Sequence, residues 1–261
     1  VATPSLIFEQ IIARLAPYIH SSVSIISCTK GIQPDPFRTM TEIISHHLGH
    51  IIGNQIGALS GPNLAKEIAE QKIAGTVIAS SNSELTSNIK LILSSSTFKV
   101  FSSSDIQGVE LAGALKNIYA ICCGIAHAKN VGENALGFII TRSMAEMSRF
   151  AVAKGANPIT FLGLSGMGDL MATCTSKLSR NFQLGELIAR DISLLEAKEL
   201  VGQVAEGART LEVVYQEAQT SQVSMPIVKS LYNILYKGVK SEQLLEDLLD
   251  HPHEVDVEFT Q

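Results

Sequence analysis

The sequence has little cysteine, and the cysteines that it has are not arranged to bind a metal. Only Cys28, Cys122, Cys123 and Cys174 are present in 261 residues. They form no C-x-x-C motif, and no histidine lies at the spacing of a zinc site. We therefore expect reduced, packed thiols of the kind found in cytoplasmic proteins.

Excess charge is also small. The chain has 25 acidic and 20 basic residues, a net charge of -5, which does not favour nucleic-acid binding. With 46% hydrophobic and 17% charged residues, the composition is typical of a folded globular protein. No basic segment followed by an apolar core opens the chain, so no secretory signal is expected. The most apolar stretch, 111–128, contains Lys116, which favours a packed core helix over a membrane span.

Common catalytic and nucleotide-binding patterns are missing as well. There is no H-E-x-x-H, no hydrolase-like Ser/His/Asp order and no G-x-G-x-x-G loop. The glycine-rich segment 163–168 has the spacing G-x-x-G-x-G, but it follows helical sequence. We expect it to be a tight connection that places Asp169 at a helix start. The histidines are expected at the surface, on a helix end and in the tail: His46, His47, His50, His251 and His253.

Strand and helix patterns alternate over the first hundred residues. Short β-branched or apolar runs predict strands, and apolar residues at helical spacing predict helices between them. Val1 is followed almost at once by a helical pattern, so the first residues are expected to be the exit from a strand. This alternation predicts an α/β sheet with an irregular or partly antiparallel end. The strands are expected at 22–27, 57–59, 75–79 and 98–101, and helices at 6–19, 37–48, 64–71 and 84–93.

Strand signals almost vanish after Asp105. Long helical segments, interrupted by glycine, asparagine and proline, continue to the end. We predict an α/β domain at 1–105 followed by an all-helical domain at 106–261. Dehydrogenases that build a substrate site between two domains often have this order, although fold alone does not establish function.

Two segments follow predicted strands. Lys30, in Thr29-Lys30-Gly31, is expected at the carboxyl end of a strand, where open α/β sheets bind ligands. A solvated surface lysine is the alternative. In Ser60-Gly61-Pro62-Asn63, Gly61 would allow close approach of a ligand and the helix start would offer free N–H groups. A plain strand-to-helix turn explains the same residues.

The helical part contains three further candidates. Lys116 lies among Ala, Leu, Ile and Cys, so its ammonium group either reaches water along its stem or pairs inside a cleft. A desolvated lysine there would suit general acid/base catalysis. Asp169 could be a helix cap or could orient a lysine. The segment 179–181, with a helix expected near Phe182, would grip a phosphate or be an exposed cap.

Taken together, these motifs resemble NAD(P)-dependent glycerol-3-phosphate dehydrogenase of the bacterial type over essentially the whole chain. The resemblance implies a partial Rossmann-like domain followed by an all-α substrate domain. It also implies NAD or NADP as cofactor, a cytoplasmic homodimer, and reversible reduction of dihydroxyacetone phosphate to sn-glycerol 3-phosphate for glycerophospholipid synthesis. The matching segments are Thr29-Lys30-Gly31, Ser60-Gly61-Pro62, Gly108-Val109-Glu110-Leu111, Gly113-Ala114-Leu115-Lys116-Asn117, 163–170, Thr173-Cys174-Thr175-Ser176, Ser179-Arg180-Asn181 and Glu206-Gly207.

The resemblance also assigns roles to individual residues. Lys116 would exchange the hydroxyl proton, Lys30 would polarise the carbonyl, and Asp169 would orient the lysines. Substrate contacts would come from Lys30, Gly61, Asn63, Lys116, Asn117, Asp169, Thr173, Ser179, Arg180 and Asn181. Cofactor contacts would come from Lys30, Ala65, Arg180, Val204 and Glu206.

The chain departs from the family pattern in places. Asn63 stands where Ser or Thr is usual, and Ala128, Lys129 and Ser143 replace glycine-containing patterns. The family opens with a strand and a G-x-G-x-x-G loop, and about 80 such residues are expected to be missing here. An alternative is therefore a non-catalytic fragment that binds phosphate or dimerises. A 6-phosphogluconate or hydroxyacid dehydrogenase is a third reading, which the lysines and Ser179-Arg180-Asn181 disfavour.

Overall fold

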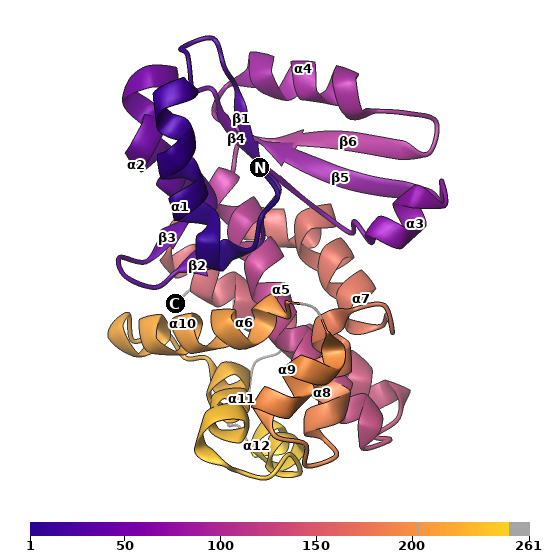
Figure 1. The fold of residues 1–261 in the computed structure, drawn as a ribbon. Helices are drawn as coiled ribbons and strands as arrows, with labels where there is room; N and C mark the ends of the chain where they lie inside the picture. The colour runs from indigo at the N-terminus through magenta and orange to yellow at the C-terminus, as the bar shows by residue number, and fades with distance from the viewer. Residues whose placement is uncertain (203, 251–261) are drawn as a thin grey trace. The chain divides into compact units, whose positions relative to one another are not determined.

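The computed structural model describes residues 1–202 and 204–250, which belong to two compact units (Figure 1). Unit 1 comprises Val1–Gly113 and Gly155–Asp169, and unit 2 comprises Ala114–Lys154 and the chain from Leu170 onward. Each unit is therefore built from two separate segments of the chain. The assignment of a cofactor role to 1–105 and a substrate role to 106–261 stays a prediction.

Unit 1 contains the α/β part. The predicted strands and helices are present, with ends shifted by a few residues. Its elements are α1 (Ser5–Leu15), η1 (Ala16–Tyr18), β1 (Ile25–Ser27), β2 (Ile32–Gln33), β3 (Arg38–Thr39), α2 (Met40–Ile52), β4 (Ile56–Ser60), α3 (Ala65–Ala69), β5 (Ala74–Ala79), α4 (Ser83–Leu93), β6 (Phe98–Ser103), the start of α5 (Ile106–Ala128), η2 (Pro158–Leu162) and η3 (Leu164–Gly168).

The main sheet has the strand order β1-β4-β5-β6. β1 and β4 are parallel, β4 and β5 are antiparallel, and β5 and β6 are parallel. The predicted partly antiparallel sheet is thus confirmed. The small hairpin of β2 and β3 was not predicted, because two-residue strands carry no periodic signal and the prolines of this segment favoured a loop.

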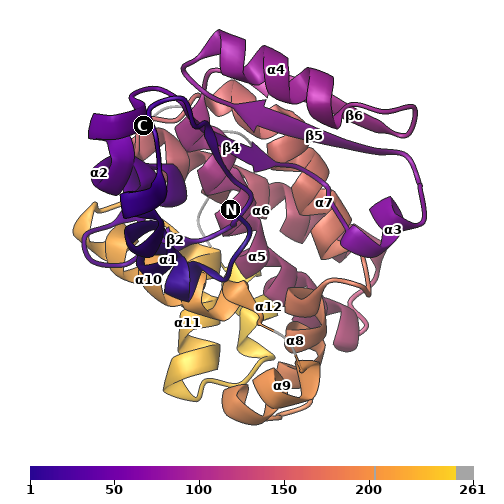
Figure 2. The same cartoon turned by 45° about the horizontal axis from the view of Figure 1, so that its top comes forward.

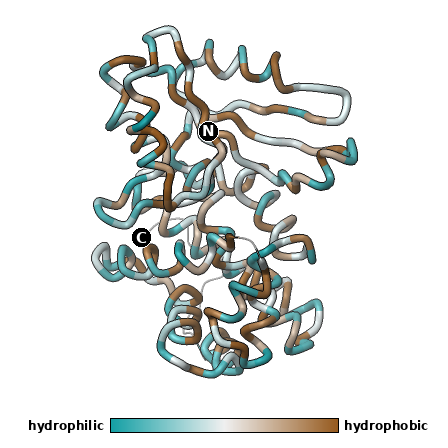
Figure 3. The backbone as a smooth tube through the Cα atoms, in the orientation of Figure 1, coloured by the Kyte–Doolittle hydropathy of each residue, from teal (hydrophilic) through white to brown (hydrophobic). Residues whose placement is uncertain are grey.

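Side chains alternate across the sheet as the pleat requires. On β5, Ile78 packs with Leu85 of α4 and Val100 of β6. Val77, its neighbour in sequence, points to the other face and packs with Val109 of α5. Both views show α4 along β5 and β6 (Figures 1 and 2). In Figure 3 the tube is brown, the colour of hydrophobic residues, along parts of these strands. This two-sided burial fixes the strand register.

The other edge of the sheet is covered by the first residues of the chain. The amino group of Val1 donates to Ile26 O (2.7 Å), and Cys28 N donates to Val1 O (2.8 Å). These two bonds join Val1 to β1, and the expected strand before α1 stays a prediction. The helices α1 and α2 pack with β1 and β4 around Phe8, Ile12 and Leu48.

Unit 2 is helical throughout the part that the structure describes, as predicted. The glycine-rich segment 163–168 lies mostly in η3, and α7 begins at Asp169, the expected helix start. The elements of unit 2 are the remainder of α5, α6 (Glu133–Ala153), α7 (Asp169–Cys174, from its second residue), α8 (Arg180–Ile188), α9 (Leu194–Val201), α10 (Glu206–Thr220), α11 (Pro226–Lys237) and α12 (Gln243–Leu249).

Helix α5 is long and apolar enough to cross a membrane, but its most apolar window is wholly buried in the protein. This burial confirms the prediction of a packed core helix. α5 crosses α8 at two glycines. A β-carbon on Gly124 would lie 2.1 Å from Phe182 O, and one on Gly185 would lie 2.1 Å from Ile121 O. Only glycine permits such close backbone contact.

Candidate functional site

Lys30 is held at the carboxyl edge of the sheet in unit 1. Its Nζ donates to Asp169 Oδ2 (2.5 Å) and to Gly61 O (3.0 Å). Lys30 follows β1 and Gly61 follows β4, and these parallel neighbours end at one edge of the sheet. The Lys30 side chain is 23% exposed and that of Asp169 is 1% exposed. Of the alternatives for Asp169, the structure shows the one in which it orients a lysine.

The backbone around Lys30 depends on two glycines. Gly61 has φ = +153°, a conformation that L side chains rarely adopt. A β-carbon on Gly113 would lie 2.5 Å from Ser60 Oγ and 3.5 Å from Lys30 Cγ. Ser60 Oγ is buried and has no hydrogen-bond partner among the described residues. The sequence analysis identified the segment Ser60-Gly61-Pro62-Asn63, but it did not identify the Ser60 hydroxyl as a candidate group.

The side-chain amide of Asn63 is hydrogen-bonded to two groups of the protein. Its Nδ2 donates to Gly75 O (3.2 Å), and its Oδ1 accepts from Thr76 Oγ1 (2.9 Å). The amide thereby bridges the turn after β4 to β5. A Ser or Thr at this position is too short to reach both partners in the same way. Its predicted contact with substrate stays a prediction.

Lys116 is buried in unit 2, with 7% of its surface exposed. Its Nζ donates to Thr173 Oγ1 (2.6 Å). Of the two alternatives left by the sequence, the structure therefore shows a lysine paired inside the protein. A hydroxyl can accept a hydrogen bond from an ammonium group and donate one to a neutral amine, so Thr173 can serve Lys116 in either protonation state.

Asn117 and Asn181 form a second network in unit 2. Asn181 Nδ2 donates to Asn117 Oδ1 (3.0 Å), and Gly207 N donates to Asn181 Oδ1 (3.0 Å). Gly207 must be a glycine here, because a β-carbon would lie 2.4 Å from Asn117 O. The network ties α5, α8 and the start of α10 together. The role of Gly207 as a partner of Asn181 could not be read from the sequence.

The start of α8 offers groups for an anion. Ser179 is the N-cap, and its Oγ accepts from Phe182 N (3.3 Å). The helix begins at Arg180, two residues before the predicted position. Arg180 is exposed, and its side chain has no hydrogen-bond partner among the residues that the structure describes. Free N–H groups and a guanidinium at one helix start favour anion binding.

The remaining predicted residues lie elsewhere. Ala65 is exposed at the first position of α3, Val204 is 55% exposed, and Glu206 is the first residue of α10. Their cofactor contacts stay predictions.

The cysteine prediction is partly wrong. All four thiols are free, and Cys122, Cys123 and Cys174 are buried, but Cys28 is exposed. Cys28 follows the short strand β1 and lies beyond its buried face, a position that composition could not reveal. The described residues contain no cluster of potential metal ligands, and His251 and His253 lie outside them.

Glu110 is the other charged residue buried on α5. Its carboxylate accepts from Thr41 N (2.9 Å) and contacts the Thr41 hydroxyl. Burial raises the pKa of Glu110 to about 7, and the hydrogen bonds from Thr41 act in the opposite direction. The sequence showed the motif around Glu110 but not its partner, which is 69 residues away.

Comparison with known proteins matches both parts of this chain. Residues 1–86 match the N-terminal domain, and residues 105–246 the C-terminal domain, of NAD-dependent glycerol-3-phosphate dehydrogenase. A glycerol-3-phosphate dehydrogenase (NAD(P)+) of Alcanivorax borkumensis is 48% identical over 99% of this chain and 75% of its own. One of Acinetobacter baylyi is 47% identical over 99% of this chain and 71% of its own.

Solved structures give the same result. A crystal structure of glycerol-3-phosphate dehydrogenase from Coxiella burnetii superposes with a TM-score of 0.90 and 33% identity, covering 96% of this chain and 76% of that one. The predicted fold class, a partial Rossmann-like domain followed by helices, is thereby confirmed, as is the predicted dependence on NAD or NADP. The chain belongs to the NAD-dependent glycerol-3-phosphate dehydrogenase family.

Proposed function

We propose that this protein reversibly reduces dihydroxyacetone phosphate to sn-glycerol 3-phosphate and that Lys116 exchanges the proton of the C2 hydroxyl. The observation that carries this proposal is the burial of Lys116 in the apolar helix α5 with Thr173 as its hydrogen-bond partner. A buried amine with a neutral partner is suited to giving and taking a proton.

Lys30 and Asp169 act on the carbonyl in this mechanism. When bound, a nicotinamide cofactor would supply the hydride for C2. The Lys30 ammonium, held by Asp169 Oδ2 and Gly61 O, stabilises negative charge that develops on the C2 oxygen. Lys116 then donates its proton to that oxygen, or accepts it in the oxidising direction. Removing one such donor costs other enzymes about 3 kcal/mol of transition-state stabilisation.

The phosphate is assigned to the start of α8. Arg180 contributes a guanidinium fork, and Ser179 and Asn181 contribute polar groups beside the first helical N–H groups. Asn117 holds the Asn181 amide in place. Because the phosphate is remote from C2, these contacts fix the position of the substrate without taking part in the chemistry.

The described residues fit a nicotinamide cofactor in part. Lys30 and the unpartnered, buried Oγ of Ser60 lie where the parallel strands β1 and β4 end, the edge at which open α/β sheets bind dinucleotides. We assign cofactor contacts to Lys30, Ala65, Arg180, Val204 and Glu206. No G-x-G-x-x-G loop for the pyrophosphate occurs in residues 1–261.

The family also supports coarser proposals about the context of this enzyme. We propose that residues 1–105 serve the cofactor and 106–261 the substrate. We further propose a cytoplasmic homodimer that supplies sn-glycerol 3-phosphate for glycerophospholipid synthesis. Light scattering at twice the chain mass would support the dimer, and a mass equal to one chain would contradict it.

Replacement of Lys116 tests the proton-transfer role. In the native enzyme, Lys116→Ala should lower kcat by about 10²–10⁴-fold, because the proton loses its relay. The dissociation constant of NADH, measured by fluorescence titration, should stay within about twofold. Lys198→Ala, at an exposed lysine of α9, is the matched control and should keep normal turnover. Near-normal kcat for Lys116→Ala would remove this residue from its assigned role.

A second candidate function is favoured by one feature, the lack of a glycine-rich phosphate loop in these 261 residues. In this alternative the chain binds phosphate or dimerises through its helical part and has no turnover. Turnover by the isolated polypeptide would rule out this alternative.

A further inference from the structure

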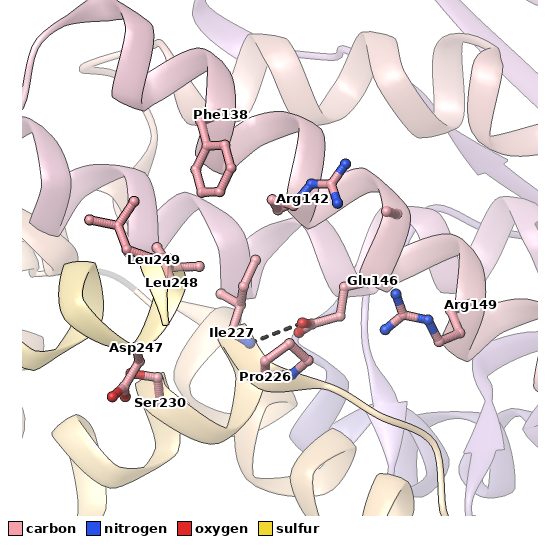
Figure 4. A pocket seen from close by; sticks show the side chains of 11 residues that line it. Phe138, Arg142, Glu146, Arg149, Pro226, Ile227, Ser230, Asp247, Leu248 and Leu249 are labelled. Carbon is pink, nitrogen blue, oxygen red and sulfur yellow. Dashed lines mark hydrogen bonds between the residues drawn. The ribbon is translucent and has the colours of Figure 1, made fainter. Parts of the chain in front are cut away.

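Buried polar side chains hold backbone segments in place in both units. In unit 2, Glu146 of α6 accepts from Ile227 N (2.9 Å) and Val228 N (3.0 Å) at the start of α11. It lies beside a cavity of about 250 Å³ that α6, α11 and α12 line (Figure 4). Helix α11 carries none of the residues proposed for the reaction. In unit 1, by contrast, the buried hydroxyl of Thr76 on β5 serves the turn that holds Lys30.

The regular pairing of β4 and β5 ends just before this turn. Ser60 of β4 is opposite Val77 of β5, and the same register would place Pro62 opposite Gly75. Proline has no N–H group, so Pro62 cannot donate to β5. A β-carbon on Gly61 would lie 3.0 Å from Gly75 O, which shows how closely the turn approaches β5. The turn therefore needs groups other than the Pro62 backbone to bond it to the strand.

Thr76 supplies the main such group. It is fully buried, and its Oγ1 donates to Asn63 Oδ1 (2.9 Å) and to Ser60 O (3.1 Å). A hydroxyl has one hydrogen, so the two acceptors share it. Because Thr76 donates to Oδ1, the Nδ2 end of the Asn63 amide is the one that faces Gly75 O (3.2 Å). Both ends of the turn are thus bonded to adjacent residues of β5.

Gly61 lies between the two bonded ends, and its carbonyl is one of two acceptors of Lys30. Lys30 Nζ donates to Gly61 O (3.0 Å) and to Asp169 Oδ2 (2.5 Å). Two acceptors from different segments define the position of Nζ more closely than one does. If the turn shifted, Lys30 would be held by Asp169 alone. A displacement of about 1 Å at a reacting group can cost about 10²-fold in rate.

We propose that Thr76 is a positioning residue for the reaction. Its hydroxyl fixes the turn after β4 and keeps Gly61 O in place for Lys30. This role rests on the proposed function of Lys30, which is to stabilise negative charge on the C2 oxygen. Thr76 acts through Gly61 and Lys30 and not on the substrate.

Thr76→Val tests the role in the native enzyme, because valine has nearly the same shape and lacks the hydroxyl. We expect kcat for dihydroxyacetone phosphate to fall about tenfold. KM should change less than about threefold, because the phosphate contacts at α8 are not altered. Thr76→Ser keeps the hydroxyl and should retain kcat within about threefold of the wild type.

Thr86→Val is the matched control in the same unit. Thr86 of α4 is also buried, and its Oγ1 donates to Ser83 O (2.9 Å). The substitution removes a buried hydroxyl of the same kind, but its acceptor belongs to α4 and not to the turn after β4. Thr86→Val should therefore keep normal turnover.

A double-mutant cycle with Lys30 separates positioning from general stabilisation of the fold. Lys30→Ala alone should lower kcat about 10²–10³-fold. In the Lys30→Ala background, Thr76→Val should change kcat less than about twofold, because the group that Thr76 positions is absent. A purely structural role would give the same loss in both backgrounds.

Circular dichroism shows whether each variant is folded. If Thr76→Val does not fold, Thr76→Cys replaces the hydroxyl with a weak donor and should show the same fall in kcat relative to Thr76→Ser. Equal losses in both backgrounds, a change confined to KM, or equal losses for the valine and serine variants would overturn the role of Thr76 alone. Normal kcat in Lys30→Ala would overturn the proposed function of Lys30 and the role of Thr76 with it.

Discussion

At the scale of single residues, the two lysines of the candidate site are held by partners of different chemical kinds. Lys30 donates to the carboxylate of Asp169, and Lys116 donates to the hydroxyl of Thr173. The first arrangement fixes an ammonium group in place, as charge stabilisation requires. The second can serve the amine in either protonation state, because a hydroxyl can accept or donate. These partners match the separate roles proposed for the two residues.

Arg180 provides a test of phosphate recognition. Because its guanidinium lies at the start of α8 without a protein partner among the described residues, removing it should affect substrate binding and not folding. Arg180→Ala should raise KM for dihydroxyacetone phosphate about 10–100-fold. Steady-state kinetics with Arg190→Ala as the control measures this effect. An unchanged KM would refute the anion assignment.

Glu110 should make stability depend on pH. Its pKa is about 7 in the folded protein, against an ordinary value of 4.5, so the folded state binds more protons between these values. Its contribution is fully present below pH 4.5 and is lost as pH rises through 7. In Glu110→Gln, a neutral amide can keep the bonds to Thr41 without this loss.

Urea unfolding between pH 5 and 8 measures the difference. Relative to Glu110→Gln, the wild-type protein should lose about 1–3 kcal/mol over this range. Glu199→Gln, at an exposed carboxylate of α9, should follow the wild type. Parallel curves for the wild type and Glu110→Gln would contradict the assignment.

At the scale of elements, helix α5 decides where several groups lie. It carries Glu110, Lys116, Asn117 and Tyr119, each bonded to a residue far away in the sequence. Its position against α8 depends on Gly124 and Gly185, whose missing side chains let the two backbones touch. The placement of Asn117 relative to Asn181 therefore rests on this crossing.

Adding one methyl group at the crossing should be costly. In Gly185→Ala, the new β-carbon would meet Ile121 O at 2.1 Å, so α8 must move away. We expect a loss of about 1–3 kcal/mol in the free energy of unfolding. Gly137→Ala in α6, where nothing lies within 4 Å, should instead gain about 0.5–1 kcal/mol from helix propensity. Chemical denaturation measures both, and equal effects would contradict the close crossing.

At the scale of the whole molecule, the residues proposed for the reaction are divided between the two units. Lys30 and Asp169 belong to unit 1, and Lys116 and Arg180 belong to unit 2. Neither unit is a continuous piece of the chain, so a cut at residue 105 would not isolate either of them. The groups proposed to bind the substrate all lie in these 261 residues, but no G-x-G-x-x-G loop does.

The polypeptide of residues 1–261 alone should therefore fold but oxidise little NADH. Without N–H groups from a glycine-rich turn, the pyrophosphate lacks its usual contacts. With dihydroxyacetone phosphate present, we expect no measurable loss of absorbance at 340 nm. Intact-mass measurement at 28.0 kDa would verify the material. Turnover by this polypeptide would refute the expectation. It would mean that residues 1–261 suffice for the reduction of dihydroxyacetone phosphate.

The sequence by itself determined the order of strands and helices, the helical character after Asp105, the family and the candidate residues. Periodicity and motif spacing depend on residues that are close together in the sequence, so they can be recognised without the structure. It left open whether Lys116 reaches water or pairs inside the protein, and whether Asp169 caps a helix or pairs with a lysine. It also left open the partners of Glu110, Asn63 and Asn181. Only the tertiary structure decided these, because each depends on a contact between segments far apart in the chain. The same holds for the cavity around Glu146, which three separate helices create.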